Sequence, residues 1–387
     1  MYDFDSIIRR KHTNSVKWDS DKEEDIIPLW VADMDFKAAP CIQQALEKRV
    51  KHGVFGYACV PQSYYEATIN WFSKRHNWKI NSSDIIYTTG VVPALSAVIK
   101  AHCNKEDRIL IQTPVYNCFF SSIRNNDCII VDSPLVLVNN KYEINFEDFE
   151  NQIIDNKVKA FVLCNPHNPA GRVWTKQELI KMGEICNKHN VLVISDEIHC
   201  ELVLPGYTYT PYASLGKPYE KNSVILTSPS KSFNIAGLQV ANIICSDKIL
   251  SDRINKAINI NEICDINPFA IEALIAAYTQ GAKWIDELNV YIKSNYELLC
   301  AFFKQQFPQL TVIDMEGTYL AWVDISRLNI TSRVLCDQLK QKAKVRLNPG
   351  TMYGTEGFVR INLASSQSIL QQALLRINKS EVLRHSF

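Results

Sequence analysis

The chain has 387 residues, of which 47% are hydrophobic and 21% are charged. This composition is typical of a globular protein with a large core. Its 42 Lys and Arg residues nearly balance its 41 Asp and Glu residues, and the formal charge is +1. That balance excludes the basic excess of nucleic-acid-binding and anionic-membrane-binding proteins, so we expect neither partner.

The twelve cysteines are scattered along the chain, and no two have C-x-x-C spacing. This distribution excludes common metal-ligand motifs and is typical of reduced thiols in a cytoplasmic protein. The N-terminal sequence MYDFDSIIRRKHTNSVKW lacks the apolar stretch of a signal peptide. No run approaches the roughly 18 apolar residues of a membrane helix. The sequence therefore predicts a cytoplasmic protein with no metal site.

From about residue 84, short β-branched apolar runs alternate with longer segments of helical periodicity. The predicted strands are residues 85–87, 108–111, 128–131, 160–164, 191–194, 224–226 and 241–245. Helices between them include residues 93–102, where Pro93 suits the first turn, and residues 176–189, where Thr175 is the expected N-cap. This alternation predicts an α/β domain with a mostly parallel, mixed sheet of seven strands between helices.

The pattern changes after residue 283. A long amphipathic helix (284–307) precedes strands at 318–323 and 358–362 and a terminal helix at 367–377. The first 45 residues are expected to be irregular and to drape over this part. We therefore predict a large domain, residues 46–283, and a smaller α+β domain made of residues 1–45 and 284–387.

Ligands of open α/β sheets bind beyond the carboxyl ends of the strands, so the segments that follow the predicted strands are the candidate site. One of them, TTGVV (88–92), opens a helix and offers backbone N–H groups to a phosphate. The other segments supply the ring of Tyr116, the amide of Asn168, the carboxylate of Asp196, the hydroxyls of Ser228 and Ser230, and the amine of Lys231.

Together these groups suit a phosphorylated, aromatic, aldehyde-bearing cofactor. Pyridoxal phosphate (PLP) fits, because it forms a Schiff base with a lysine and pairs its ring nitrogen with an aspartate. Lys231 lies at the inner end of an apolar strand, where a charged amine is costly. A Schiff base removes that charge, which explains a lysine at this position.

Three motifs extend this interpretation: NPHNPAG (165–171), SDEIH (195–199) and SPSKSFNIAGLQ (228–239). Their order resembles that in the fold-type I PLP enzymes of the class I/II aminotransferase group, and the likeness covers almost the whole chain. Within the group the chain is most similar to the cystathionine β-lyase and cysteine-S-conjugate β-lyase branch. The segments that carry this second likeness are PLWVADMDF (28–36), FGY (55–57), His199 and FNIAGLQ (233–239).

The resemblance implies the following cofactor-binding roles. Lys231 holds PLP and later removes the Cα proton of the substrate, and Asp196 pairs with the ring nitrogen. Tyr116 stacks on the ring, Asn168 binds its oxygen, and His199 stands where many aminotransferases have a tyrosine. Backbone groups of Gly90, Val91 and Val92 hold the phosphate together with Ser228 and Ser230. A purely structural histidine remains an alternative for His199.

The resemblance also implies how a small amino-acid substrate is bound. Arg360 takes the α-carboxylate, Asn168 lies beside it, and Ala32 and Asp33 line the pocket. Tyr57 matches a residue that reaches into the site of the partner subunit. We therefore expect a homodimer with shared active sites and count Tyr57 with Lys231 and Asp196 among the catalytic residues.

The expected activity is PLP-dependent C–S β-lyase cleavage of L-cystathionine or related cysteine S-conjugates to a thiol, pyruvate and ammonia. A class I/II aminotransferase is the nearest alternative, because it shares every cofactor residue. Gln239 favours the lyase, since many aminotransferases have a phosphate-binding arginine at this position, eight residues after the lysine. A non-catalytic PLP-fold regulator is a third possibility. A nicotinamide dehydrogenase is disfavoured, because no G-x-G-x-x-G motif opens a helix.

Overall fold

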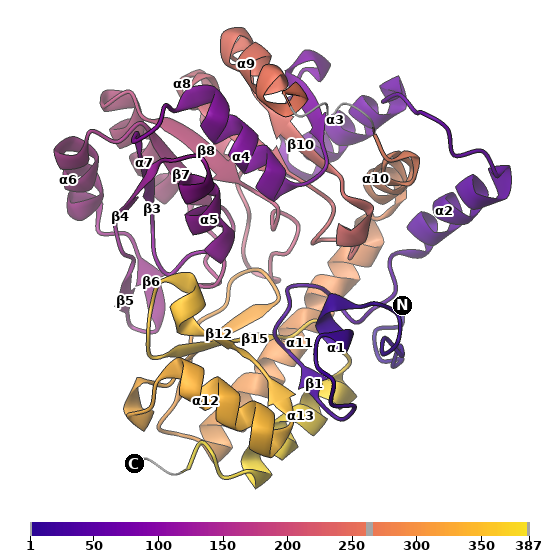
Figure 1. Cartoon of the computed structure of the whole chain (residues 1–387), viewed down its shortest axis with the longest axis vertical. Helices are drawn as coiled ribbons and strands as arrows, with labels where there is room; N and C mark the ends of the chain where they lie inside the picture. The colour runs from indigo at the N-terminus through magenta and orange to yellow at the C-terminus, as the bar shows by residue number, and fades with distance from the viewer. Residues whose placement is uncertain (1, 261–265, 385–387) are drawn as a thin grey trace.

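The computed structural model describes residues 2–260 and 266–384. Figure 1 shows a larger part, at the top, built around a seven-stranded sheet with strand order β2-β10-β9-β8-β7-β3-β4. Its strands are β2 (Ile85–Thr88), β3 (Arg108–Ile111), β4 (Ile129–Asp132), β7 (Ala160–Cys164), β8 (Leu192–Asp196), β9 (Ser223–Thr227) and β10 (Ala241–Ile244). Only β10 runs antiparallel to its neighbours in this sheet. The predicted mixed, mostly parallel sheet is confirmed.

Helices cover both faces of the sheet because successive strand residues point to opposite sides. Ile109 and Ile111 pack in the cluster formed with α4 (Val91–His102), α5 (Asn117–Asn125) and α9 (Lys248–Asn259). Leu110, between them, belongs to the cluster of the other face. The helices on that face are α3 (Gln62–His76), α6 (Phe146–Asn156), α7 (Lys176–Lys188) and α10 (Pro268–Gln280). The central strands are therefore mostly apolar, as in sheets buried on both sides.

Two helix starts agree with the sequence. Pro93 lies in the first turn of α4, which begins at Val91. Thr175 caps α7 through a reciprocal capping box with Glu178, so that two backbone N–H groups of the helix end are bonded. Because α4 begins directly after β2, its N-terminus lies at the carboxyl edge of the sheet.

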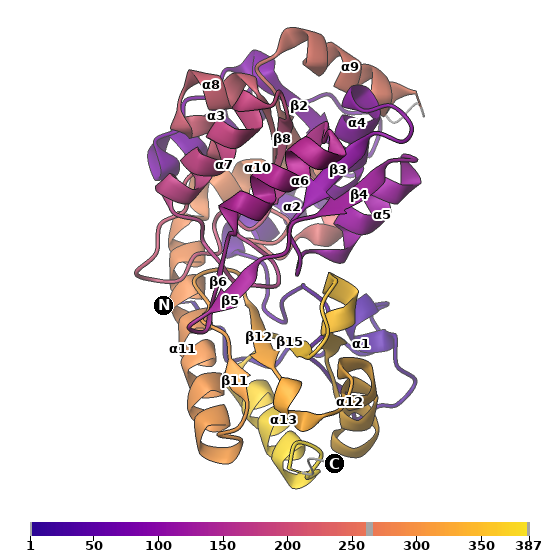
Figure 2. The ribbon, with the colours of Figure 1, turned by 90° about the vertical axis from the view of Figure 1, so that its left-hand side faces the viewer.

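The lower part in Figure 1 is built around a four-stranded antiparallel sheet, order β11-β12-β15-β14. Its strands are β11 (Thr311–Val312), β12 (Leu320–Asp324), β14 (Asn348–Pro349) and β15 (Phe358–Asn362). Helices α11 (Ala282–Gln306), α12 (Ser332–Gln338) and α13 (Gln367–Lys379) accompany it, and α11 links the two parts in both views (Figures 1 and 2). The hairpin of β5 (Val136–Val138) and β6 (Lys141–Glu143) reaches down from the upper part.

The N-terminal segment lies against the C-terminal part of the chain, because β1 (Ile27–Pro28) pairs in parallel with β13 (Val345–Arg346). The expectation that all of the first 45 residues are irregular is wrong in detail. A short helix, α1, spans Val16–Asp19, and α2 spans Pro40–His52 with its proline at the first helical position. The domain boundaries at residues 45 and 283 stay predictions.

Across the described residues, no helix has the length and apolar content needed to cross a bilayer. The eleven cysteines in this part of the chain are free thiols, and Cys264 lies outside it.

Candidate active site

A cavity at the carboxyl edge of the large sheet brings together predicted residues that are far apart in sequence. It lies between the N-terminus of α4, the segments that follow β3, β7, β8 and β9, and residue 32 of the N-terminal segment. The predicted residues that line it are Ala32, Gly90, Val91, Val92, Tyr116, Asn168, Asp196, His199, Ser230 and Lys231.

Lys231 lies in the turn that follows β9. Its Nζ donates a hydrogen bond of 2.6 Å to the carbonyl oxygen of Ala32. Burial, assisted by the positive charge of Arg360, lowers the pKa of the Lys231 amine. A lowered pKa increases the neutral fraction of the amine, which is the form that attacks an aldehyde or accepts a proton.

Asp196 is the last residue of β8 and is 4% exposed. Its Oδ1 accepts a bond of 3.1 Å from the backbone N–H of Ile198, and no cation within the described ranges pairs with it. Burial raises the pKa of this carboxyl to about 7. A buried carboxylate without a cation is the complement of a protonated ring nitrogen, so this residue fits the cofactor that the sequence indicates.

His199 is held as a neutral imidazole. Burial and the nearby charges of Lys231 and Arg360 lower its pKa to about 3. Its Nδ1 is buried and has no partner in the part of the chain that the structure describes. A satisfied structural histidine would have one, so the open Nδ1 indicates a place for a ligand group.

One end of the cavity is formed by the start of α4, where Gly90 precedes the first helical residues Val91 and Val92. N–H groups in the first turn of a helix have no carbonyl partner within the helix. Ser230 lines the cavity, whereas Ser228 lies behind it, with its Oγ 2.7 Å from Ser230 Oγ. Gln239 is exposed, and no hydrogen bond of its side chain occurs among the described residues.

The guanidinium of Arg360, on β15, approaches the cavity from the small sheet. Its Nη1 donates to Asn168 Oδ1 at 3.2 Å and its Nη2 to the carbonyl oxygen of Trp30 at 2.8 Å. It lies 4.7 Å from the centre of the Tyr353 ring. Its buried Nε has no partner among the residues described. A guanidinium with unused donor capacity beside the cavity suits a carboxylate ligand.

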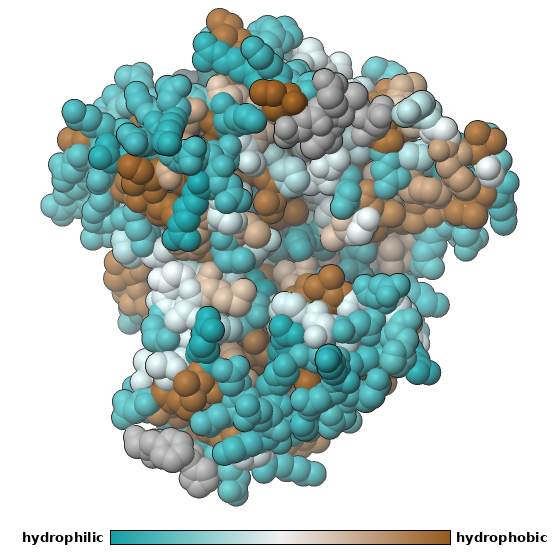
Figure 3. Space-filling model, in the orientation of Figure 1, coloured by the Kyte–Doolittle hydropathy of each residue, from teal (hydrophilic) through white to brown (hydrophobic). Residues whose placement is uncertain are grey.

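Asp33 and Tyr57, like Ser228 and Arg360, are not among the residues that line the cavity. Asp33 is paired with Arg10, with Asp33 Oδ2 and Arg10 Nη2 2.7 Å apart. Tyr57 is 96% exposed and lies on an arm between α2 and α3, near the exposed residues Val54 and Phe55. Figure 3 shows hydrophobic atoms gathered on the arm that projects to the right, where Figure 1 shows the end of α2.

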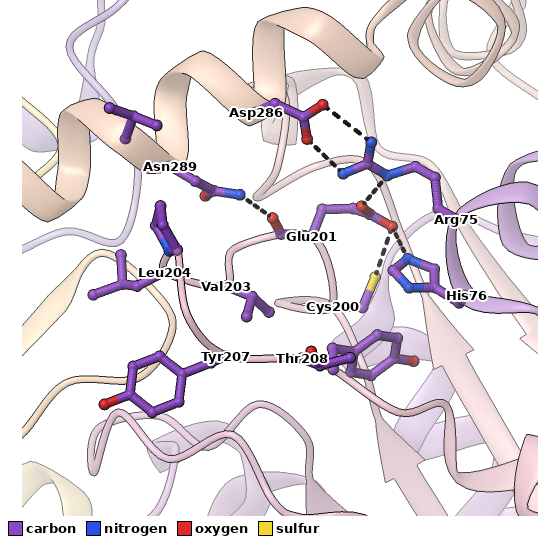
Figure 4. A pocket seen from close by; sticks show the side chains of 13 residues that line it. Arg75, His76, Cys200, Glu201, Val203, Leu204, Tyr207, Thr208, Asp286 and Asn289 are labelled. Carbon is purple, nitrogen blue, oxygen red and sulfur yellow. Dashed lines mark hydrogen bonds and ion pairs between the residues drawn. The ribbon is translucent and has the colours of Figure 1, made fainter.

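Sequence reasoning missed Glu201, which follows Asp196 and His199 in the chain and whose carboxylate faces Arg75 and His76 in Figure 4. Its buried carboxylate accepts hydrogen bonds from Trp71 Nε1 at 2.7 Å, Arg75 Nε at 2.9 Å and His76 Nε2 at 2.6 Å. All three donors belong to α3.

The turn that contains Glu201 is also tied to α11. Asn289 Nδ2 donates to the carbonyl oxygen of Glu201 at 2.7 Å, and Arg75 also pairs with Asp286 at 2.8 Å. No local motif marks Glu201, because its partners are more than 80 residues away in sequence. The charged residues around Glu201 form ion pairs. Among the described residues, no group of three or more His, Cys, Asp or Glu side chains is placed to hold a metal ion.

Sequence reasoning also missed Tyr319, on the turn before β12. Its hydroxyl donates to the carbonyl oxygen of Ala32 at 3.0 Å, and its ring meets that of His199 edge to face with centroids 6.2 Å apart. Only the folded chain brings these groups together, so the sequence contains no signal for this contact.

The comparisons with known proteins agree with this geometry. The family model described as aminotransferase class I and II matches residues 24–377. The chain is 41% identical to cystathionine beta-lyase PatB of Bacillus subtilis, covering 97% of this chain and 98% of that protein. The predicted resemblance to this family is confirmed.

Two solved structures are similar along almost the whole chain. A PLP-bound putative aminotransferase from Clostridium difficile is 43% identical, with a TM-score of 0.96, covering 98% of this chain and 100% of that one. Cystalysin from Treponema denticola, whose structure contains PLP, is 34% identical with a TM-score of 0.93 and covers 98% of both chains.

Proposed function

Because the chain belongs to the aminotransferase class I and II family, we propose that it is a PLP-dependent carbon–sulfur β-lyase that acts on L-cystathionine or a related cysteine S-conjugate. The observation that carries this proposal is the meeting of the Lys231 amine, the unpaired carboxylate of Asp196 and the N-terminus of α4 in one cavity. The relatives named cystathionine beta-lyase and cystalysin support the choice of lyase chemistry.

In this proposal each end of PLP has a matching partner. The first N–H groups of α4 and the Ser230 hydroxyl would hold the phosphate, with Ser228 supporting Ser230. Asp196 would hold a proton at the ring nitrogen, and Tyr116 would lie against the ring. Asn168 and His199 would face the ring oxygen. Lys231 would hold the aldehyde carbon.

PLP supplies the electron-withdrawing ring that makes loss of a Cα proton feasible. The chain supplies the other requirements. Arg360 binds the α-carboxylate and fixes the orientation of the bond to be broken. The Lys231 amine removes the Cα proton, and the C–S bond then breaks with its electron pair leaving on sulfur.

The thiolate takes a proton and leaves as a thiol. Water hydrolyses the remaining amino-acid fragment to pyruvate and ammonia. One thioether and one water thus give one thiol, one pyruvate and one ammonium ion, with no oxidant or reductant required.

An aminotransferase remains the second candidate, because one similar structure carries that name. Two features of this chain favour the lyase. Gln239 replaces the arginine that many aminotransferases place near the phosphate, and it is exposed rather than turned into the cavity. His199 replaces a tyrosine and is neutral.

We also propose that the working unit is a cytoplasmic homodimer. Tyr57 lies outside its own cavity on an arm with exposed Val54 and Phe55. An exposed apolar patch of this kind suits burial against a second copy of the chain. The free cysteines suit a reducing compartment.

The decisive experiment measures pyruvate formed from L-cystathionine by the PLP-loaded protein with no 2-oxo acid added. A lyase sustains turnover, whereas an aminotransferase stops after one equivalent because it lacks an acceptor. Lys231→Ala serves as the control and should form no pyruvate. If the wild-type protein forms none from any cysteine thioether but transfers amino groups to an added 2-oxo acid, the lyase proposal is wrong.

A further inference from the structure

The segment Trp30 to Asp33 contributes Ala32 to the cavity wall, and side chains from both parts of the molecule hold its backbone. The carbonyl oxygen of Trp30 accepts from Asn348 Nδ2 at 2.9 Å and from Arg360 Nη2 at 2.8 Å. Asn362 Nδ2 donates to the carbonyl oxygens of Val31 and Asp33. Three of the four carbonyls of this segment are therefore fixed relative to the small sheet.

The remaining carbonyl of the segment, that of Ala32, accepts two hydrogen bonds. One comes from Lys231 Nζ at 2.6 Å and the other from the Tyr319 hydroxyl at 3.0 Å. A carbonyl oxygen has two lone pairs, so these two donors fill its capacity. The lysine of the cavity and a tyrosine that precedes β12 thus share one acceptor.

Tyr319 is suited to a fixed donor. It is completely buried, and burial raises the pKa of its phenol, so the hydroxyl keeps its proton. Its ring packs edge to face against His199, which fixes the direction of the hydroxyl. A rigid donor on one lone pair of the Ala32 oxygen leaves a single direction for the second donor.

We infer that Tyr319 is a positioning residue for the proton transfer performed by Lys231, acting through the carbonyl oxygen of Ala32. An amine that donates one N–H to a fixed oxygen has its lone pair restricted in direction, and that lone pair is what takes the Cα proton. Tyr319 also competes with Lys231 for the oxygen, which limits the stabilisation of the charged ammonium. The inference rests on the proposed function because it takes Lys231 as the base.

Tyr319→Phe removes the hydroxyl and keeps the ring against His199. Tyr296→Phe is the matched control, because the Tyr296 hydroxyl also donates to a backbone carbonyl, that of Ile313, at 3.0 Å. The first measurement needs no turnover. Visible absorbance measures the rate at which Lys231 of the cofactor-free protein forms its bond with PLP, at a series of pH values. The midpoint of the dependence of this rate on pH reports the pKa of the Lys231 amine.

In Tyr319→Phe the midpoint should move up by about half to one pH unit, which corresponds to one net hydrogen bond. In Tyr296→Phe it should not move. In turnover, kcat for pyruvate formation should fall by on the order of 10-fold with KM changed less than about twofold, as for loss of an interaction made during the proton transfer. The isotope effect from deuterium at Cα should rise, because proton removal becomes slower relative to the other steps.

An unchanged midpoint together with an unchanged isotope effect would overturn the inference. Equal effects in both tyrosine variants would also overturn it, since they would indicate a general loss of packing. If the wild-type protein forms no pyruvate, the proposed function fails, but the absorbance midpoint still decides whether Tyr319 acts on Lys231.

Discussion

Asn168 Oδ1 and Arg360 Nη1 lie 3.2 Å apart and join the two parts of the molecule beside the cavity. Asn168 follows β7 of the large sheet, and Arg360 is in the middle of β15 of the small sheet. A substrate carboxylate bound to Arg360 would therefore be placed relative to the ring-binding residues by a short and fully buried connection.

Arg360→Lys tests this relationship. Lysine keeps the charge but loses the planar fork, and a charge-assisted hydrogen bond contributes about 1.5–3 kcal/mol. We expect KM for the amino acid to rise on the order of 10–100-fold, while the dissociation constant of PLP stays within about twofold. Steady-state kinetics and a PLP absorbance titration measure the two quantities. Arg376→Lys, on α13 and outside the cavity, is the control, and an unchanged KM in Arg360→Lys would contradict the carboxylate role.

Much of this arrangement could be predicted from the sequence because each contributing segment is local. Gly90, Asp196 and Lys231 each lie at or just after the end of a short apolar strand, next to a polar or glycine-containing turn. This local pattern is enough to identify them as candidate site residues from the sequence. The carboxyl-edge rule for α/β sheets then predicted that they meet, and they line one cavity.

The residues that sequence reasoning missed work through long-range contacts with the backbone or with buried charges. Tyr319 is 287 residues from Ala32, whose carbonyl it binds. Glu201 looks like any polar residue after SDEIH, and only the folded chain surrounds it with three donors from α3. Local propensity contains no information on such pairs.

Asp196→Asn should change how stability depends on pH in the cofactor-free protein. Burial raises the pKa of Asp196 to about 7 in the folded chain, above the ordinary value of 3.8 for this side chain. Between these two pH values the folded state binds a proton that the unfolded state has lost, so stability falls as pH rises from about 4 to about 7. Asparagine does not titrate and avoids this loss.

The free energy of unfolding of the cofactor-free Asp196→Asn variant, minus that of the wild type, should therefore be larger at pH 8 than at pH 4. The increase should be on the order of 2–4 kcal/mol. Thermal unfolding across this pH range measures the difference. With PLP bound, the order should reverse, because the wild-type carboxylate then has a cation to pair with. Asp286→Asn, at an exposed ion pair, is the control. A pH-independent difference in the cofactor-free proteins would contradict the raised pKa.

Glu201→Gln should destabilise the turn that holds Asp196 and His199. The amide has one acceptor oxygen in place of two and brings N–H donors toward the donors of Trp71, Arg75 and His76. Breaking a buried ion pair on one side costs about 3–5 kcal/mol. Glu150→Gln, which also faces a lysine and a histidine but at the surface, should lower the thermal midpoint far less. Equal shifts of the thermal midpoint in the two variants would show that Glu201 has no special role.

Tyr57 should act in the cavity of the partner subunit, which a mixing experiment can show directly. Tyr57→Ala and Lys231→Ala homodimers should each form little or no pyruvate. A mixed dimer of the two contains one site with an intact lysine from one subunit and an intact tyrosine from the other. Random reassembly makes half of the dimers mixed, and each mixed dimer has one working site of two, so about a quarter of the wild-type activity should return.

The recovered activity should require that subunits exchange. Sedimentation can establish the dimer and its concentration dependence, and mixing under conditions that prevent exchange should restore nothing. A mixture of Lys231→Ala with Asp196→Asn is the matched control, because both residues line the same cavity of one chain. Its mixed dimers contain no intact site and should stay inactive. If the Tyr57 mixture also stays inactive after proven exchange, Tyr57 serves its own chain or only the interface, and the shared-site proposal is wrong.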